Sequence, residues 1–151
     1  IRKSSSRYSS PPMIVYNGSK PRLVIDYVQL NKVTEVEKCS LPRVDDIRLY
    51  VYRRQVQGST IFSTLDLKSG FILVPLTTSA IPIAAFTDCD GNLWEPLRSF
   101  FGLKGSPTHF QKVMDGVLAG INNCFVYIDD ILLYSKTIEE HLALLSTVNC
   151  S

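Results

Sequence analysis

The alternation of apolar and polar positions predicts several short strands. Residues 13–16 ("MIVY") and 22–30 ("RLVIDYVQL") are apolar runs separated by "NGSKP", and an Asn-Gly pair between such runs is typical of a tight β-hairpin. Residues 59–67 ("STIFSTLDL") alternate, so that Ile, Ser and Leu face one way while Phe, Thr and Asp face the other. Residues 71–76 ("FILVPL") and 81–87 ("IPIAAFT") predict two further strands, and the "DCDG" that follows predicts a turn.

Three other segments have apolar residues at helical spacing. Residues 41–54 ("LPRVDDIRLYVYRR") predict a helix with a proline near its start. Residues 106–121 ("SPTHFQKVMDGVLAGI") predict the strongest helix, and their Ser-Pro pair suits a cap followed by a first turn. Residues 137–145 ("TIEEHLALL") predict a short helix, in which Thr137 and Glu140 have the spacing of a capping box.

The order of these elements favours an α+β fold. Strands and helices are mixed, tight turns join them and no long βαβαβ run occurs, which is typical of an antiparallel sheet with packed helices. A length of 151 residues suits a single domain. We expect an irregular segment at residues 1–12, the domain at residues 13–145 and a divergent tail at residues 146–151. Because the chain lacks an initial methionine, we expect it to be part of a longer protein.

Composition narrows the class of protein without identifying a function. The chain is 45% hydrophobic and 20% charged, which is typical of a globular protein rather than a disordered one. Its net charge of +2 permits nucleic-acid binding but does not argue for it. No stretch is long and apolar enough to span a membrane, and none of the four cysteines is in a CxxC pair. We therefore expect neither membrane insertion nor a structural zinc site.

An adjacent pair of carboxylates, Asp129 and Asp130, lies inside the most strand-like segment, "CFVYIDDILLYS". If the apolar runs on both sides pair, the two aspartates form the tip of a two-residue hairpin. Asp-Asp is a poor choice for such a loop, and neighbouring carboxylates repel each other, so a divalent cation would stabilise them. The alternative is a solvated turn that carries two surface charges.

A third carboxylate, Asp66, ends the alternating strand "IFSTLD". If that strand lies beside the Asp-Asp hairpin, three carboxylates meet at one end of a sheet. Oxygen ligands of this kind suit magnesium or manganese, and a pair of such ions activates a hydroxyl and stabilises a leaving phosphate oxygen. Spacing along the chain does not show whether the two strands are neighbours.

Five ordered blocks carry a family resemblance, namely "RLVIDYVQLNKVT", "SLPRVDD", "FSTLDLKSGF", "FFGLKGSPTHFQ" and "VYIDDILLYSKTIEEHL". Together they resemble the reverse transcriptase domain of the Pol polyprotein of gypsy-like LTR retrotransposons, over roughly residues 1 to 145. The resemblance implies a right-handed polymerase fold, of which this chain holds fingers and palm without a thumb. It also implies an RNA-directed DNA polymerase, a nucleotidyltransferase that extends a primer 3′-hydroxyl with deoxynucleoside triphosphates on an RNA or DNA template.

The resemblance assigns roles residue by residue. Asp66, Asp129 and Asp130 would bind two Mg²⁺ ions, with Mn²⁺ as an alternative, and Leu67 would add its backbone carbonyl. The expected nucleotide-binding residues are Arg22, Ser69, Gly70, Phe71 and Gln111, and the expected template and primer contacts are Tyr127, Phe101, Gly102 and Lys104. Each of these residues, taken alone, also fits a purely structural role. Arg22 fits an exposed strand arginine, Ser69 and Gly70 fit a turn, Phe71 fits a core aromatic and Gln111 fits a solvated helix face.

Several polar positions depart from the family pattern. The usual fingers lysine has no clear counterpart, Val28 replaces an arginine, and residues 48–60 ("RLYVYRRQVQGST") form a longer connection than usual. An inactive relic, or a domesticated nucleic-acid-binding module of the same fold, is therefore the alternative function. The family further implies that the rest of Pol (thumb, RNase H, integrase) accompanies the domain, inside the cell, in a cytoplasmic virus-like particle.

Overall fold

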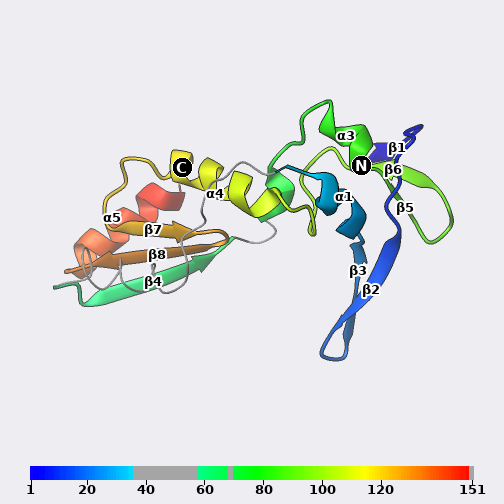
Figure 1. The fold of residues 1–151 in the computed structure, drawn as a ribbon. Helices are drawn as coiled ribbons and strands as arrows, with labels where there is room; N and C mark the ends of the chain where they lie inside the picture. Colours follow the sequence, from blue (N-terminus) through cyan, green and yellow to red (C-terminus); the bar gives the residue numbers. More distant parts are fainter. Residues whose placement is uncertain (36–57, 68–69, 150–151) are drawn as a thin grey trace. The chain divides into compact units, whose positions relative to one another are not determined.

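The computed structural model describes residues 1–35, 58–67 and 70–149, and these residues form two compact units. The first unit combines Ile1–Lys38 with Ser69–Pro107, and the second combines Cys39–Lys68 with Thr108–Ser151 (Figure 1). The helix predicted at residues 41–54, most of the long connection and Ser69 lie outside the described residues.

A small antiparallel sheet in the first unit has the order β1-β6-β5, formed by Arg2–Lys3, Leu93–Glu95 and Phe86–Thr87. The prediction of an irregular segment at residues 1–12 is therefore wrong at β1. Its first residue is held by a side-chain bond that sequence spacing could not show, because Arg2 Nε lies 2.8 Å from Oε2 of buried Glu95.

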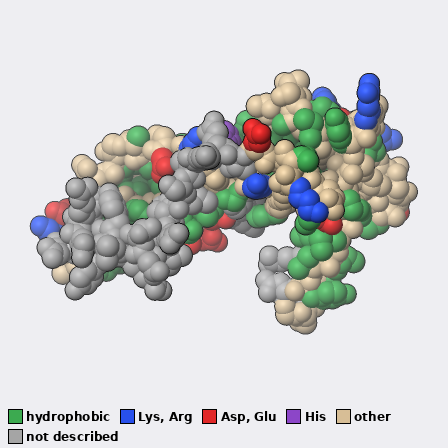
Figure 2. All heavy atoms as spheres, viewed as in Figure 1, with side chains coloured by type: hydrophobic (Ala, Val, Ile, Leu, Met, Phe, Trp, Pro, Cys, Tyr) green, Lys and Arg blue, Asp and Glu red, His purple; other side chains and the backbone are tan. Residues whose placement is uncertain are grey.

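The predicted hairpin is confirmed as β2 (Pro12–Asn17) paired with β3 (Lys20–Ile25). Its large apolar side chains lie exposed along β2, and hydrophobic atoms follow the hairpin in Figure 2. The expected continuation of β3 as a strand through residue 30 is wrong, because helix α1 (Val28–Val33) begins there. The Asp26 carboxylate accepts a hydrogen bond from Val28 N at 2.9 Å, which favours a turn into the helix.

The core of the first unit is built on Ile25, Tyr27 and Phe86. The Tyr27 side chain is 1% exposed, and its hydroxyl donates a hydrogen bond of 2.8 Å to Ala84 O. The two strands predicted over residues 71–87 are mostly wrong: the 3-10 helix η2 (Gly70–Leu73) and helix α3 (Ala80–Ile83) occupy this segment, and only β5 remains a strand. Short apolar runs fit a buried helical turn as well as a strand.

The second unit is built on an antiparallel sheet with the order β4-β8-β7, formed by Ile61–Asp66, Asp130–Ser135 and Cys124–Tyr127 (Figure 1). The alternation predicted for β4 is confirmed, because half-buried and exposed residues follow one another along the strand. Together with the first unit's sheets, this confirms an α+β fold with antiparallel strand pairs.

Two helices complete the second unit. Helix α4 (Ser106–Val117) begins where predicted but ends four residues early, before Gly120, whose φ is +84°. Helix α5 (Ile138–Asn149) starts with the predicted capping box, since Glu140 N donates to Thr137 Oγ1 and Thr137 N donates to a Glu140 oxygen. It also runs through residues 146–149, which we expected to be a divergent tail. None of the helices in the described ranges is long and apolar enough to cross a membrane.

Candidate active site

The tertiary structure brings the three aspartates to one end of the β4-β8-β7 sheet. Asp66, the last residue of β4, is the Cα partner of Asp130, the first residue of β8. On the other side, Asp130 pairs with Tyr127, the last residue of β7. Asp129 immediately precedes Asp130 in the turn. The sequence could only suppose that these strands are neighbours. The structure shows that they are, and their register places the three aspartates at the same end of the sheet.

The turn itself differs from the expected one by one residue. Because Tyr127 pairs with Asp130, the two loop residues are Ile128 and Asp129, and not the two aspartates. Ile128 has a φ of +53°, in the left-handed region that β-branched residues rarely adopt. Such a backbone conformation costs of order 1–3 kcal/mol and persists only where surrounding contacts impose it.

The environment of Asp129 disfavours its negative charge. Burial raises the pKa of this carboxyl above its usual range, and the nearby Asp66 and Asp130 carboxylates raise it further. Within the described part of the chain, Asp129 Oδ1 is a buried side-chain oxygen without a hydrogen-bond partner. The backbone of the same residue is tied down, because its carbonyl accepts a hydrogen bond of 2.9 Å from Leu67 N.

These features fit a hard divalent cation in their chemistry. All the potential ligand atoms are oxygens, the neighbouring carboxylates repel one another, and among the described residues one buried oxygen lacks a hydrogen-bond partner. Among the residues whose placement is described, however, no three acidic, His or Cys side chains already form a group that could hold an ion. The strand register therefore places the three aspartates at one end of the sheet, but their like-charged side chains would have to move closer together to bind an ion.

Gln111 occupies a place that the sequence did not predict. The solvated helix face considered for it is wrong, because the residue is 8% exposed. Its Oε1 accepts a hydrogen bond of 2.7 Å from Ile128 N, and its Nε2 donates to Val126 O at 3.1 Å. The spacing to buried Met114, three residues on, is the sequence signal that could have placed Gln111 on the inner face. The predicted nucleotide contact of Gln111 stays a prediction.

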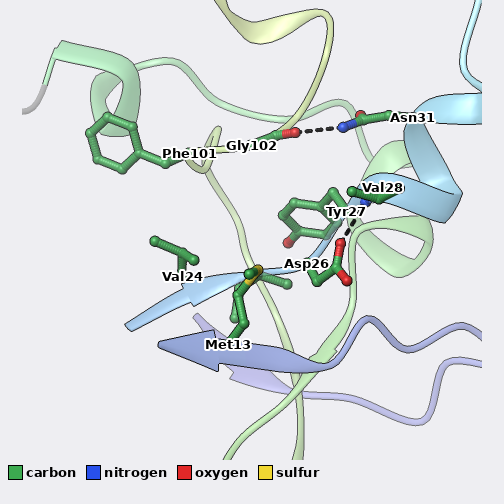
Figure 3. Close-up of a pocket in the computed structure, with 9 residues that line it drawn as sticks. Met13, Val24, Asp26, Tyr27, Val28, Asn31, Phe101 and Gly102 are labelled. Carbon is green, nitrogen blue, oxygen red and sulfur yellow. Dashed lines mark hydrogen bonds between the residues drawn. The ribbon is translucent and has the colours of Figure 1, made fainter. Parts of the chain in front are cut away.

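The first unit contains a separate pocket of about 270 Å³, lined mainly by apolar groups (Figure 3). Two of the predicted template contacts, Phe101 and Gly102, line it, together with Met13 and Asp26. Asn31, which the sequence reasoning missed, fixes the loop: its Nδ2 donates to Gly102 O at 2.7 Å, and its Oδ1 accepts from Lys104 N at 2.8 Å.

Glycine is required at position 102. Its φ is +98°, and a Cβ there would lie 3.4 Å from Ile25 O. The glycine thus lets the loop approach β3 at the wall of the pocket.

The remaining predicted residues divide between the two units. Tyr127 is half-buried in the second unit, whereas Lys104 is exposed and Gly70 is buried in the first. Arg22 is paired with Val15 in the hairpin, and Phe71 belongs to η2. The structure therefore gathers the predicted metal ligands in one unit and most predicted nucleotide and template contacts in the other.

Known proteins resemble this chain over most of its length. The chain is 35% identical to a retrovirus-related Pol polyprotein from transposon 297 of Drosophila melanogaster over 94% of its residues, and 40% identical to an enzymatic polyprotein of Cestrum yellow leaf curling virus over 98%. It spans only 14% and 23% of those proteins. The expected kinship with transposon Pol polyproteins is confirmed, and plant virus polyproteins share it.

Solved structures agree with this kinship. A foamy viral protease-reverse transcriptase in complex with double-stranded DNA matches 97% of the chain with a TM-score of 0.82 and 30% identity. The same kind of protein with an RNA/DNA hybrid matches with a TM-score of 0.83 and 29% identity. The chain covers 25% and 19% of those proteins, and the match confirms a fingers and palm fragment.

The family model described as "Reverse transcriptase (RNA-dependent DNA polymerase)" matches residues 2–150. The same family is indicated by this match, by the related sequences and by the aspartates that pair at the sheet end. The chain belongs to the reverse transcriptase family.

Proposed function

We propose that this chain is the fingers and palm part of an RNA-directed DNA polymerase from a retroelement Pol polyprotein. It transfers nucleotides from deoxynucleoside triphosphates to the 3′-hydroxyl of a primer on an RNA or DNA template. The observation that carries the proposal is the register of β4 against β8, which sets Asp66 opposite Asp130 and next to Asp129 in a chain of this family.

The three carboxylates would hold two Mg²⁺ ions, or Mn²⁺, with the Leu67 carbonyl as a further oxygen donor. When bound, such ions lower the pKa of the attacking hydroxyl and neutralise charge on the triphosphate. The burial and charge that raise the pKa of Asp129 support this role, because an ionised carboxylate there needs a cation to offset its neighbours. Leu67 N holds the Asp129 backbone, which limits how far this carboxylate can move.

Nucleotide binding falls to residues placed mostly in the first unit. Arg22 would bind phosphate through its planar guanidinium, Ser69 and Gly70 would offer backbone amides to the triphosphate, and Phe71 would lie beneath the sugar and exclude a 2′-hydroxyl. Gly70 begins η2, and its lack of a side chain supports a close approach of backbone to a ligand.

Template and primer contacts are proposed for Phe101, Gly102, Lys104 and Tyr127. The pocket beside Phe101 and Gly102 supports a place for the templating base, because its walls are apolar enough to pack against a base. Lys104 is exposed and carries the charge that a phosphate contact needs. The solved relatives named above, which are complexes with double-stranded DNA and an RNA/DNA hybrid, support a duplex partner.

The wider setting follows from the length of the relatives. Because the chain spans a small part of each Pol or enzymatic polyprotein, we propose that thumb, RNase H and integrase regions accompany it in the whole protein. We also propose that the polyprotein acts in a cytoplasmic virus-like particle. An inactive relic or a domesticated binding module is not favoured, because the three carboxylates and their register are retained in a chain that matches the family throughout.

Primer extension by the complete Pol reading frame that contains this chain tests the proposal. The wild type is compared with Asp129→Asn and Asp66→Asn in the presence of Mg²⁺, and Asp90→Asn serves as a charge-matched control in an exposed turn of the first unit. We expect the rate of primer extension to fall about 100-fold or more in the two site variants. Each variant removes a carboxylate that would bind the metal ions, and these ions stabilise negative charge on the reacting phosphate. Extension that is equal in the wild type and Asp129→Asn would show that the assignment is wrong.

A further inference from the structure

The carboxamide of Gln111 joins helix α4 to the turn that carries Asp129. We propose that Gln111, oriented by Asp115, is a positioning residue that holds the Ile128–Asp129 turn in the conformation needed for Asp129 to bind a cation. The inference rests on the proposed function, in which Asp129 is a ligand. It assigns Gln111 a role that does not require contact with the nucleotide.

Gln111 provides the hydrogen-bond acceptor for Ile128, the strained residue of the turn. Ile128 N lies in a two-residue loop, between strand ends whose closing pair is Tyr127 and Asp130. The bond of 2.7 Å from this N–H to Gln111 Oε1 provides its acceptor, and the side chain that accepts is 92% buried. An unpartnered N–H at a half-buried position would be costly, so this bond favours the left-handed conformation of Ile128.

Asp115 fixes the orientation of the Gln111 amide. Gln111 Nε2 donates to Asp115 Oδ1 at 2.8 Å, one helical turn further along α4. An ionised carboxylate accepts hydrogen bonds and cannot donate them, so Asp115 requires the nitrogen of the amide to face it. The oxygen of Gln111 then faces Ile128, while the second N–H of Nε2 is available to Val126 O at 3.1 Å. Asp115 thereby selects the amide orientation that the turn needs.

Hydrogen bonds connect the turn to the end of β4, which carries Asp66. The two loop residues are each held by one hydrogen bond: Ile128 N donates to Gln111 Oε1, and Asp129 O accepts from Leu67 N. Leu67 follows Asp66 directly. The backbone bond from Leu67 therefore places one cation ligand relative to another, and the side-chain bond from Gln111 on α4 holds the residue that precedes Asp129 in the turn. Loss of the α4 bond leaves the turn held by the Leu67 bond alone, so we expect Asp129 to sample more conformations.

A purely structural role of Gln111, which only satisfies a buried polar group, predicts a different outcome. In that case a substitution lowers stability but leaves cation affinity unchanged in the folded chain. A positioning role predicts that cation affinity falls further than the loss of stability can explain. The two roles are therefore separated by measuring both quantities on the same variants.

The experiment uses the full 151-residue chain and Mn²⁺ as the probe. Gln111→Met keeps the length of the side chain and removes its hydrogen bonds, Asp115→Leu removes the group that orients the amide, and Asp115→Asn retains an acceptor oxygen. Met114→Val, a core change on the same helix, is the control for lost stability. Amide exchange of Ile128 is measured by NMR without metal, and Mn²⁺ binding is measured by the electron paramagnetic resonance signal of the free ion.

We expect Ile128 N to exchange about tenfold or more faster in Gln111→Met and Asp115→Leu, and the Mn²⁺ dissociation constant to rise about tenfold. Met114→Val should stay close to the wild type in both measurements. Asp115→Asn should fall between the wild type and Asp115→Leu, because an asparagine can present either its oxygen or its nitrogen to Gln111. Unchanged exchange at Ile128, or an unchanged dissociation constant in the folded variants, would overturn the inference. Should Gln111→Met fail to fold, Asp115→Leu decides, because its side chain is exposed.

Asp129→Asn separates this inference from the proposed function. If that change leaves Mn²⁺ binding unaltered, the proposed cation site is wrong, and the role of Gln111 in placing a ligand is wrong with it. If Asp129→Asn abolishes binding but Gln111→Met does not weaken it, the cation site stands and the positioning role alone is overturned.

Discussion

Replacement of Asp129 by asparagine should stabilise the metal-free chain while it removes the response to metal. The Asp129 carboxyl is partly buried, its Oδ1 has no partner among the described residues, and its pKa is raised by burial and by Asp66 and Asp130. An asparagine has nearly the same shape without the charge. Its introduction therefore removes the burial cost and two repulsive interactions from the folded state.

The expected gain is about 1 kcal/mol in the free energy of unfolding, which corresponds to a rise of about 2–4 °C in Tm for a chain of this size. The sign follows from the pKa. A raised pKa means that the folded chain favours the protonated carboxyl, so wild-type stability falls as the pH rises above the ordinary value of 3.8. The advantage of the variant should accordingly be largest near neutral pH and disappear in acid, where wild-type Asp129 is itself neutral.

Bound metal should make the wild type more stable than Asp129→Asn, which is the reverse of their order without metal. At a Mn²⁺ concentration about 100 times the dissociation constant, binding stabilises the wild type by about 2.7 kcal/mol. The variant lacks one ligand and should gain much less. Thermal unfolding followed by circular dichroism, in EDTA and in Mn²⁺, measures both effects, and Asp90→Asn controls for the change in net charge. The reasoning fails if Asp129→Asn melts below the wild type in EDTA, or if Mn²⁺ stabilises both equally.

Three further predictions concern the packing within each of the two units. Tyr27→Phe should lower the free energy of unfolding by about 1–2 kcal/mol in a urea titration, because it leaves Ala84 O without its donor. Burial raises the pKa of Tyr27 to about 12, so the wild type should lose stability as the pH rises from 10 through 12. The variant has no hydroxyl to ionise and should lack this loss. His141→Leu should cost about 2–3 kcal/mol in the same titration, because the buried imidazole bonds two serine hydroxyls, one on β4 and one on β8, each at 2.8 Å; a change below 0.5 kcal/mol would contradict this reading. Gly102→Ala should cost about 1–2 kcal/mol because of its positive φ, whereas Gly105→Ala, where a Cβ meets nothing within 4 Å, should be nearly neutral; equal effects would refute the conformational argument.

Local patterns predicted those elements whose signals lie within a few residues. The capping box of Thr137 and Glu140 set the start of α5, and strict alternation identified β4 and its two faces. The Asn-Gly signal located the β2-β3 hairpin. The capping box and the hairpin turn depend on residues that are neighbours along the chain. The alternation of β4 depends on which face of that one strand is buried.

Predictions failed where distant contacts decided the local conformation. Residues 71–87 are apolar enough for strands, but they contain the helical segments η2 and α3, and only Phe86–Thr87 pairs with β6. Gln111 looked like a polar residue on a solvated face, yet the hairpin that it bonds follows 15 to 17 residues later. Neither outcome is encoded in hydrophobic spacing alone, because the partner group comes from another part of the chain.

The sequence by itself determined the α+β class, the family and the identity of the three carboxylates, because these depend on residue types and their order. Only the tertiary structure decided that β4 lies against β8 with Asp66 opposite Asp130, and that the turn consists of Ile128 and Asp129. The physical reason is that a shift of one residue in strand register turns every side chain to the other face, and register is set by what each face buries. Here Gln111 on α4 and His141 on α5 form hydrogen bonds to the turn and to β4, and these bonds favour the observed register.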